Sequence, residues 1–363
     1  MKHLLRICVI SSIVFALVSL SHGQDGATRA EFECLMLNNS SKVAAPGNLL
    51  SAQSYHHVWT PGLTYSSFKS NGLDLMYETQ GDGQEVVIVV HGGPGLPHEY
   101  FHPMLTNLSH YAKLVYFDRR ADMLSAQLPH QPVSLDEMAD DLDALRQSLG
   151  LNRVTLLAHS FGGAIALNYA VRHPENVKRL ILVSAAATIE NPGEAEKRIV
   201  KKLSPIELSL YKSNEGGTGG SSPCERVRKR YSVLYPHYFH KLIPYEFDRG
   251  IYTVYFDALA KKLALANSAQ RLDVRDQLSA IKVPVMVVAG RYDLVTPLDQ
   301  SAALAERLPR SRFVVMEHSA HFPFFEENYM FTQWVRQFMA GTSDMLDDRT
   351  SPVSATVSSG GRR

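Results

Sequence analysis

The sequence predicts an α/β fold in which a mostly parallel sheet carries helices on both faces and accepts one inserted, largely helical cap. Short β-branched runs alternate with amphipathic helix patterns along most of the chain, which is typical of parallel strands joined by helical crossovers. The alternation breaks once, from about residue 187 to residue 280, where helical patches and a glycine-rich GGTGG segment replace it. A chain of 363 residues is long enough for one large domain with such an insertion.

The expected strands start with a hairpin over residues 65–68 and 73–79, which turns at Asn71-Gly72. Residues 85–90 (EVVIVV) form a β-branched run of the kind found in buried parallel strands. The remaining expected strands, most of them followed by a helix pattern, are residues 113–117, 153–158, 179–184, 283–289 and 312–316.

Two helix starts carry a capping box, Ser134 with Glu137 and Ser204 with Glu207. In each box the serine hydroxyl and the glutamate carboxylate satisfy N–H groups that have no partner inside the helix. The first helix is expected to end at Gly150 and to carry its apolar side chains on one face: Leu135, Met138, Leu142, Leu145 and Leu149.

The two ends of the chain differ from its centre. Residues 1–23 are expected to be a signal peptide for export, since Lys2 and Arg6 introduce an apolar run and Ser21-His22-Gly23 offers a cleavage site. The alternative, a membrane anchor, requires a longer run of about 20 apolar residues. The expected division of the chain continues with an N-terminal extension at 24–62, an α/β core at 63–186 and 281–340, the cap at 187–280 and a disordered tail at 341–363.

A candidate nucleophile lies in residues 158–163 (AHSFGG), between an apolar strand and a helix rich in small residues. In the G-x-S-x-G pattern the serine occupies a sharp, strained turn that exposes its hydroxyl. Ala158 replaces the first glycine of that pattern and is still small. Ser160 is therefore the expected nucleophile, and the alternative is a Ser-Gly turn without chemistry.

A glycine-rich loop follows the strand at 85–90. Acyl transfer builds negative charge on a carbonyl oxygen, which preorganised backbone N–H groups stabilise. We expect the N–H groups of Gly93 and Phe161 to form this oxyanion hole. The rest of the loop, His91, Gly92, Pro94 and Gly95, is expected to support it.

An acid and a base complete the pattern, because Asp293 follows the strand at 283–289 and His321 follows the last strand. His321 would accept the proton of Ser160 and pass it to the leaving group, while Asp293 fixes the tautomer of the imidazole. Among the neighbouring residues, His159 is expected to pack or bond locally and His318 has no assigned role. Asp118 and Asp299 are competing acids.

With these motifs in the order Ser, Asp, His, the chain resembles the proline iminopeptidase branch of the α/β-hydrolases over roughly residues 65–338. The most specific element is HGGPG at 91–95, which that branch carries as an oxyanion loop. The resemblance implies the same triad and oxyanion hole, and the release of N-terminal residues, often proline, from short peptides. The segment after residue 116 resembles the D-Q-R-G segment of the branch at Asp118, Arg120 and Ser125, and departs from it at Arg119, Ala121 and Met123.

Three functions remain open at this point: an aminopeptidase-like hydrolase, an esterase, lactonase or amidase with the same machinery, and a non-catalytic binding module. The intact triad argues against the binding module. The aminopeptidase needs carboxylates to hold a substrate amine, and the cap lacks the characteristic motif of the branch. The candidate acids in the cap are Glu190, Glu194, Glu196, Glu207, Glu215, Glu225 and Glu246.

The expected partner is a small molecule or a short peptide. A formal net charge of +1 gives no argument for nucleic acid or for an acidic membrane surface, and no stable membrane insertion is expected after signal cleavage. The oligomeric state stays open. We recognise no paired metal-ligand spacing among the His and Cys residues, so neither a metal nor a cofactor is expected.

Cys34 and Cys224 are the two cysteines left after signal cleavage, and they form either a disulfide or two free thiols. A bridge would close a loop of nearly two hundred residues, for which the chain-entropy treatment gives roughly 4–5 kcal/mol of stabilisation. Mass spectrometry of the unreduced, exported protein should then show the two peptides joined. Alkylation of both thiols without reduction would contradict the bridge.

Overall fold

The computed structural model describes residues 62–93, 98–117, 119, 134–188, 192–213, 229–230, 232–241 and 273–341. The predicted signal peptide, the tail beyond residue 341, Cys34 and Cys224 lie outside these residues, as does most of the N-terminal extension. None of the helices in the described part of the chain combines the length and the apolar composition that crossing a bilayer requires.

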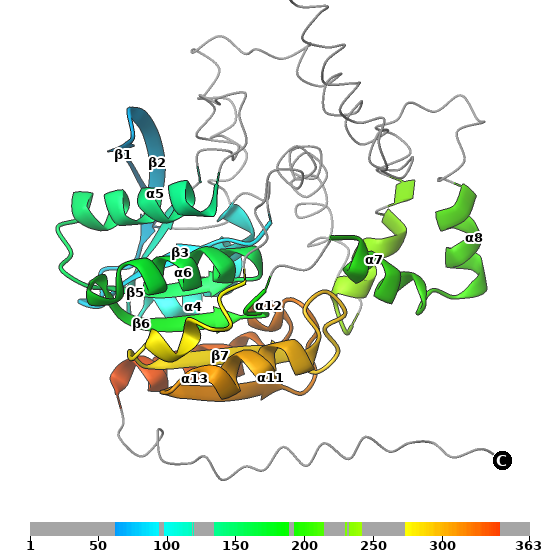
Figure 1. The fold of residues 1–363 in the computed structure, drawn as a ribbon. Helices are drawn as coiled ribbons and strands as arrows, with labels where there is room; N and C mark the ends of the chain where they lie inside the picture. Colours follow the sequence, from blue (N-terminus) through cyan, green and yellow to red (C-terminus); the bar gives the residue numbers. More distant parts are fainter. Residues whose placement is uncertain are drawn as a thin grey trace, which may run out of the picture.

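A single eight-stranded sheet runs through the molecule in the order β1-β2-β4-β3-β5-β6-β7-β8 (Figure 1). β1 and β2 form the predicted antiparallel hairpin, β2 also pairs antiparallel with β4, and the other pairs are parallel. The predicted α/β fold with a mostly parallel sheet is thus confirmed. The strands are β1 (Thr64–Ser70), β2 (Leu73–Gln80), β3 (Val86–Val90), β4 (Lys113–Phe117), β5 (Val154–His159), β6 (Val177–Val183), β7 (Val285–Gly290) and β8 (Ser311–Met316).

Each face of the sheet packs against its own set of helices. Apolar residues of the central strands alternate between the faces, so that Leu156 and Ala158 of β5 join one core while Leu157 joins the other. The first core includes α5 (Leu135–Ser148), α6 (Phe161–Arg172) and α11 (Leu298–Arg307). The second includes η2 (His98–Phe101), α4 (His102–Ser109), α12 (Pro323–Glu326) and α13 (Asn328–Ala340).

The predicted cap contributes helices to the described structure. α7 (Pro192–Val200) and α8 (Pro205–Ser213) stand apart from the strands in Figure 1, and the short η4 (Tyr235–Tyr238) follows them in sequence. The second capping box is formed, because Ser204 N–H donates to Glu207 and Glu207 N–H donates to the Ser204 hydroxyl. Arg198 of α7 donates to the carbonyls of Leu294 and Val295, which fixes α7 beside the loop that follows β7.

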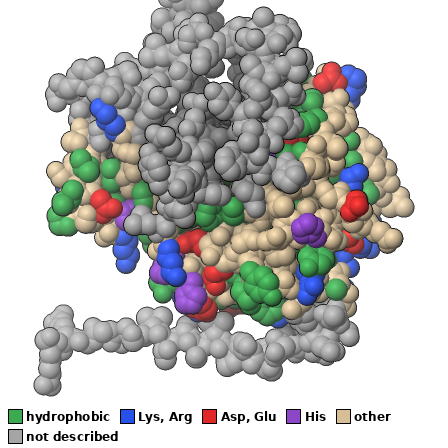
Figure 2. Space-filling model, turned by 180° about the vertical axis from the view of Figure 1, so that it is seen from behind, with side chains coloured by type: hydrophobic (Ala, Val, Ile, Leu, Met, Phe, Trp, Pro, Cys, Tyr) green, Lys and Arg blue, Asp and Glu red, His purple; other side chains and the backbone are tan. Residues whose placement is uncertain are grey.

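The surface of the described residues carries charges of both signs. Figure 2 shows acidic and basic side chains scattered over the visible part of this face, without a large patch of one sign. This agrees with the near-zero net charge and favours no polyanionic partner on the visible face.

The first capping box allows a test of the fold. Ser134 accepts a hydrogen bond from Glu137 N–H, and the Glu137 carboxylate accepts one from Ser134 N–H. Ser134→Ala should therefore lower the free energy of unfolding by about 1 kcal/mol, measured by urea denaturation. Ser148→Ala, at an exposed position in the last turn of the same helix, is the matched control and should have a smaller effect. Equal losses in both variants would contradict the role of the cap.

Candidate active site

Ser160 occupies a sharp turn between β5 and α6. Its backbone has φ 52° and ψ −121°, which a non-glycine residue rarely adopts, as the sequence pattern predicts. The turn also brings α6 close to the end of β3. A Cβ on Gly162 would lie 2.3 Å from the carbonyl oxygen of Val90, so this position of the helix requires glycine.

The three residues expected to form the triad lie together at the carboxyl ends of β5, β7 and β8. His321 Nε2 is 3.1 Å from the Ser160 hydroxyl, and His321 Nδ1 is 2.9 Å from Oδ2 of Asp293. The Asp293 side chain is fully buried. When Nδ1–H donates to this carboxylate, Nε2 remains as the acceptor that faces the serine proton.

Asp293 is itself held in place by the backbone. Its Oδ1 accepts hydrogen bonds from the N–H groups of Val295, at 2.8 Å, and Thr296, at 2.9 Å, which leaves Oδ2 directed at His321. The competing acid Asp299 is exposed in the first turn of α11, where it accepts a hydrogen bond from Gln300 N–H. The other competing acid, Asp118, lies outside the described residues.

The loop that carries His321 is fixed by two consecutive glutamates. The Glu326 carboxylate accepts hydrogen bonds from the N–H groups of Ala320, at 2.7 Å, and of His240, at 2.7 Å, and burial raises the pKa of this carboxyl. Glu327 accepts the N–H of His318, a residue that is exposed. The N–H of His321 donates to the Tyr238 carbonyl at 2.9 Å, so the segment around η4 touches the candidate base directly.

A buried hydrogen-bond chain connects the glycine-rich loop with the candidate base. Gly92 N–H donates to the Tyr100 hydroxyl at 2.7 Å, and this hydroxyl lies 2.9 Å from His159 Nδ1. His159 Nε2 lies 2.9 Å from the carbonyl oxygen of His321. Burial lowers the pKa of His159 well below its usual value, so the ring is neutral. Tyr100 therefore donates to Nδ1, and Nε2–H donates to the carbonyl, which gives His159 the local bonding role expected from the sequence.

Arg119 supports the glycine-rich loop from the other side. Its buried guanidinium donates to the Gly92 carbonyl at 2.9 Å, lies 3.1 Å from His91 Nδ1 and sits 5.3 Å from the centre of the Phe161 ring. In the sequence Arg119 is recognisable only as a departure from the family pattern, and nothing there indicates this contact. Within the loop Gly93 has φ 122°, which requires glycine, while Pro94 and Gly95 lie outside the described residues.

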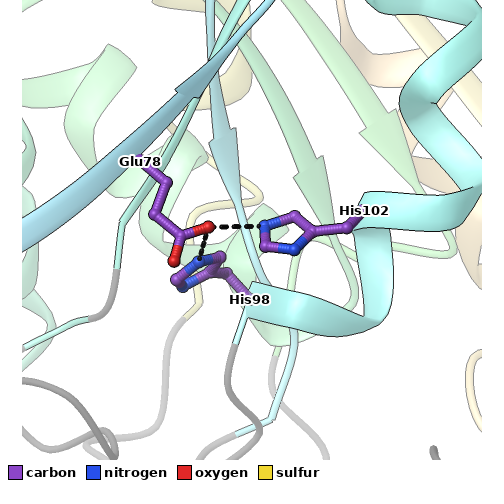
Figure 3. A group of neighbouring side chains, drawn as sticks. All are labelled: Glu78, His98 and His102. Carbon is purple, nitrogen blue, oxygen red and sulfur yellow. Dashed lines mark ion pairs between the residues drawn. The ribbon is translucent and has the colours of Figure 1, made fainter. Parts of the chain in front are cut away.

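A buried cluster, which the sequence did not predict, is formed by Glu78 of β2, His98 of η2 and His102 of α4. The expectation of no paired metal-ligand spacing is wrong for these two histidines. Residues 98–102 read HEYFH, an H-E-x-x-H pattern that places two histidines four residues apart. Glu78 Oε2 lies 3.2 Å from His98 Nε2 and 2.9 Å from His102 Nε2 (Figure 3). Burial opposes ionisation of Glu78, but the bonds and charge of the two imidazoles outweigh it and hold the pKa of the carboxyl well below its usual value.

The described acids of the cap already have partners. Glu194 pairs with Lys197, Glu196 accepts from the Tyr211 hydroxyl and pairs with Arg230, and Glu207 caps α8 and pairs with His237. The other four candidate amine ligands, Glu190, Glu215, Glu225 and Glu246, lie outside the described residues.

Comparison with known proteins places the chain in a family. The alpha/beta hydrolase fold family matches residues 85–205 and 230–328, which is more than half of the chain, so the protein belongs to that family. A proline iminopeptidase of Saccharolobus solfataricus is 26% identical over 275 residues, covering 73% of this chain and 87% of the relative. A proline iminopeptidase of Clostridioides difficile is 25% identical over 290 residues, covering 75% and 97%. The resemblance to the proline iminopeptidase branch is thus confirmed, and the protein is a hydrolase.

The structural comparison agrees with this fold. An esterase from Exiguobacterium antarcticum superposes with a TM-score of 0.58 at 24% identity, covering 76% of this chain and 99% of that chain. At this identity the likeness concerns the fold, and the sheet with helices on both faces is what the two chains share.

Tyr100 provides a test of the buried hydrogen-bond chain. Tyr100→Phe removes the hydroxyl that joins Gly92 N–H to His159, and we expect kcat to fall about tenfold, the equivalent of one hydrogen bond, with KM changed less. The matched control is Tyr169→Phe, which removes a hydroxyl that binds Asp143 instead. Steady-state kinetics of both variants on one ester substrate provides the measurement, and equal kcat for the Tyr100 variant and the parent protein would contradict the proposed link.

Proposed function

We propose that this hydrolase works through an acyl-enzyme, with Ser160 as nucleophile, His321 as general base and acid, and Asp293 as the group that orients His321. The observation that carries the proposal is the continuous line of hydrogen bonds from Asp293 through His321 to Ser160. A serine hydroxyl is a weak nucleophile unless an adjacent base accepts its proton, and this geometry supplies such a base.

The reaction follows from these positions. Ser160 Oγ attacks the substrate carbonyl while its proton moves to His321 Nε2, and the buried Asp293 carboxylate stabilises the imidazolium. When the tetrahedral intermediate collapses, His321 gives the proton to the leaving group. Water then attacks the acyl-enzyme with His321 again as base, which releases the acid product and restores the Ser160 hydroxyl.

The oxyanion of the intermediate needs backbone donors. Phe161 is the first residue of α6, where N–H groups point out of the helix and the helix dipole favours negative charge. In the glycine-rich loop, Gly92 N–H is occupied by Tyr100, so the neighbouring N–H of Gly93 is the loop donor in this proposal.

For the substrate we propose an aminopeptidase-like activity that releases N-terminal residues, with proline favoured, from small peptides. The HGGPG sequence at 91–95 and the proline iminopeptidases among the relatives support it. A second candidate, an esterase, lactonase or amidase activity, is favoured by a different observation. Glu194, Glu196 and Glu207 are all engaged by neighbouring side chains or by a helix start, which leaves the described part of the cap without an obvious binding site for an ammonium.

Asp293→Asn tests the assignment of the acid. The amide retains the packing but presents its NH₂ or carbonyl in place of the carboxylate, so His321 loses its preferred tautomer and kcat should fall by about 10⁴. Asp299→Asn is the matched control at an exposed position and should leave kcat close to that of the parent protein. If the control is the variant that loses activity, the acid has been assigned to the wrong residue.

Free and N-acetylated aminoacyl arylamides separate the two candidate substrates. A site that holds an ammonium with buried carboxylates should disfavour the acetylated compound at least a hundredfold in kcat/KM, because a buried charge left unpaired costs roughly 3–5 kcal/mol. Ser160→Ala gives the background rate, since loss of the nucleophile should lower kcat by about a factor of a million. Equal rates on both arylamides, with good turnover of short acyl esters, would favour the esterase or amidase.

A further inference from the structure

We propose that Glu78, His98 and His102 form a binding site for one divalent transition-metal ion, with Zn²⁺ as the preferred occupant. This site is separate from the triad and has no part in the proposed acyl transfer. A bound ion would connect strand β2 of the hairpin to η2 and α4, whose first residues are His98 and His102.

The arrangement of the donor atoms supports a metal site. One potential ligand atom from each of the three residues lies within 4.8 Å of the others, and all three residues are buried. The two imidazole rings have centroids 5.1 Å apart and converge on the same carboxylate oxygen of Glu78 (Figure 3). Around a tetrahedral Zn²⁺ neighbouring ligand atoms are about 3.3 Å apart, given bonds of 2.0–2.2 Å. The observed separations of 3.2 and 2.9 Å come within a few tenths of an ångström of that value.

The chemistry of the donors narrows the choice of ion. Two imidazoles and one carboxylate form a set that suits Zn²⁺, whereas Ca²⁺ and Mg²⁺ prefer sites made of oxygen ligands. The H-E-x-x-H spacing at 98–102 brings the two histidines onto one side of the chain, and Glu78 arrives from a different element. The three ligands thus come from three elements, β2, η2 and α4, which a bound ion would join.

The alternative for this cluster is a set of ion pairs and hydrogen bonds, in which both imidazoles direct an Nε2–H group at the Glu78 carboxylate. A bound metal ion needs the lone pairs of both Nε2 atoms, so it replaces these two protons. The two arrangements differ in whether the folded protein binds a metal.

A bound ion would flank Tyr100, a residue that supports the glycine-rich loop. This residue lies between His98 and His102 in sequence, and its hydroxyl accepts the hydrogen bond from Gly92 N–H in the glycine-rich loop. Fixing both flanking histidines would restrict the position of the Tyr100 backbone, so the ion is expected to contribute to stability rather than to the chemical step.

The experiment loads the chelator-treated full chain with Zn²⁺ alone and measures bound metal by inductively coupled plasma mass spectrometry after desalting. We expect about one equivalent per chain and a rise in Tm of at least about 2 °C, since an ion that binds the folded state stabilises it. His102→Gln and Glu78→Gln should lose this equivalent, while His110→Gln, at an exposed position just after α4, should keep it.

Location of the ion is checked without any variant. Anomalous scattering at the zinc edge from crystals of the loaded chain should give a peak between Glu78, His98 and His102. A folded parent protein that takes up no Zn²⁺ would overturn the proposal in favour of the hydrogen-bonded cluster. Metal located elsewhere, or full retention of the equivalent by a folded His102→Gln variant, would overturn it as well.

Discussion

The turn at Ser160 is the constraint on which the site depends. A serine with positive φ holds its hydroxyl out at the end of β5, and this backbone conformation costs energy that the surrounding structure must supply. The close contact between Gly162 and the Val90 carbonyl locks α6 against β3 at the same point. Because β3 leads directly into the glycine-rich loop, one packing contact positions both Ser160, the proposed nucleophile, and the loop beside it.

Much of the fold follows from local sequence patterns. Short apolar runs predicted the parallel strands of the described sheet, the Asn71-Gly72 turn predicted the hairpin, and the box at Ser134 and Glu137 marked the start of α5. These features depend on residues close together in the chain, where periodicity and capping chemistry act directly. Local patterns do not predict the strand order, with β4 between β2 and β3, because this order arises from packing across the whole sheet.

The candidate site likewise has residues that local sequence patterns predict and supporting residues that they do not. Ser160, Asp293 and His321 stand in motifs at strand ends, so the sequence pointed to them before any geometry was known. The support around them could not be predicted, because it joins residues far apart in the chain: Arg119 reaches the Gly92 carbonyl, and His159 bonds the backbone of His321. The histidines at 98 and 102 had a recognisable spacing, but nothing in the sequence identified Glu78 as their partner.

The contact between η4 and the loop of His321 bears on how such enzymes diversify. The backbone carbonyl of Tyr238 accepts a hydrogen bond from the N–H of His321. The Glu326 carboxylate accepts hydrogen bonds from the N–H groups of His240 and Ala320. The residues around η4, which belong to the predicted cap, therefore help to hold His321 in place and are not merely a cover that could be exchanged freely. Grafting a cap from another member of the family would transplant specificity only if the short piece around residues 238–240 stayed with its host.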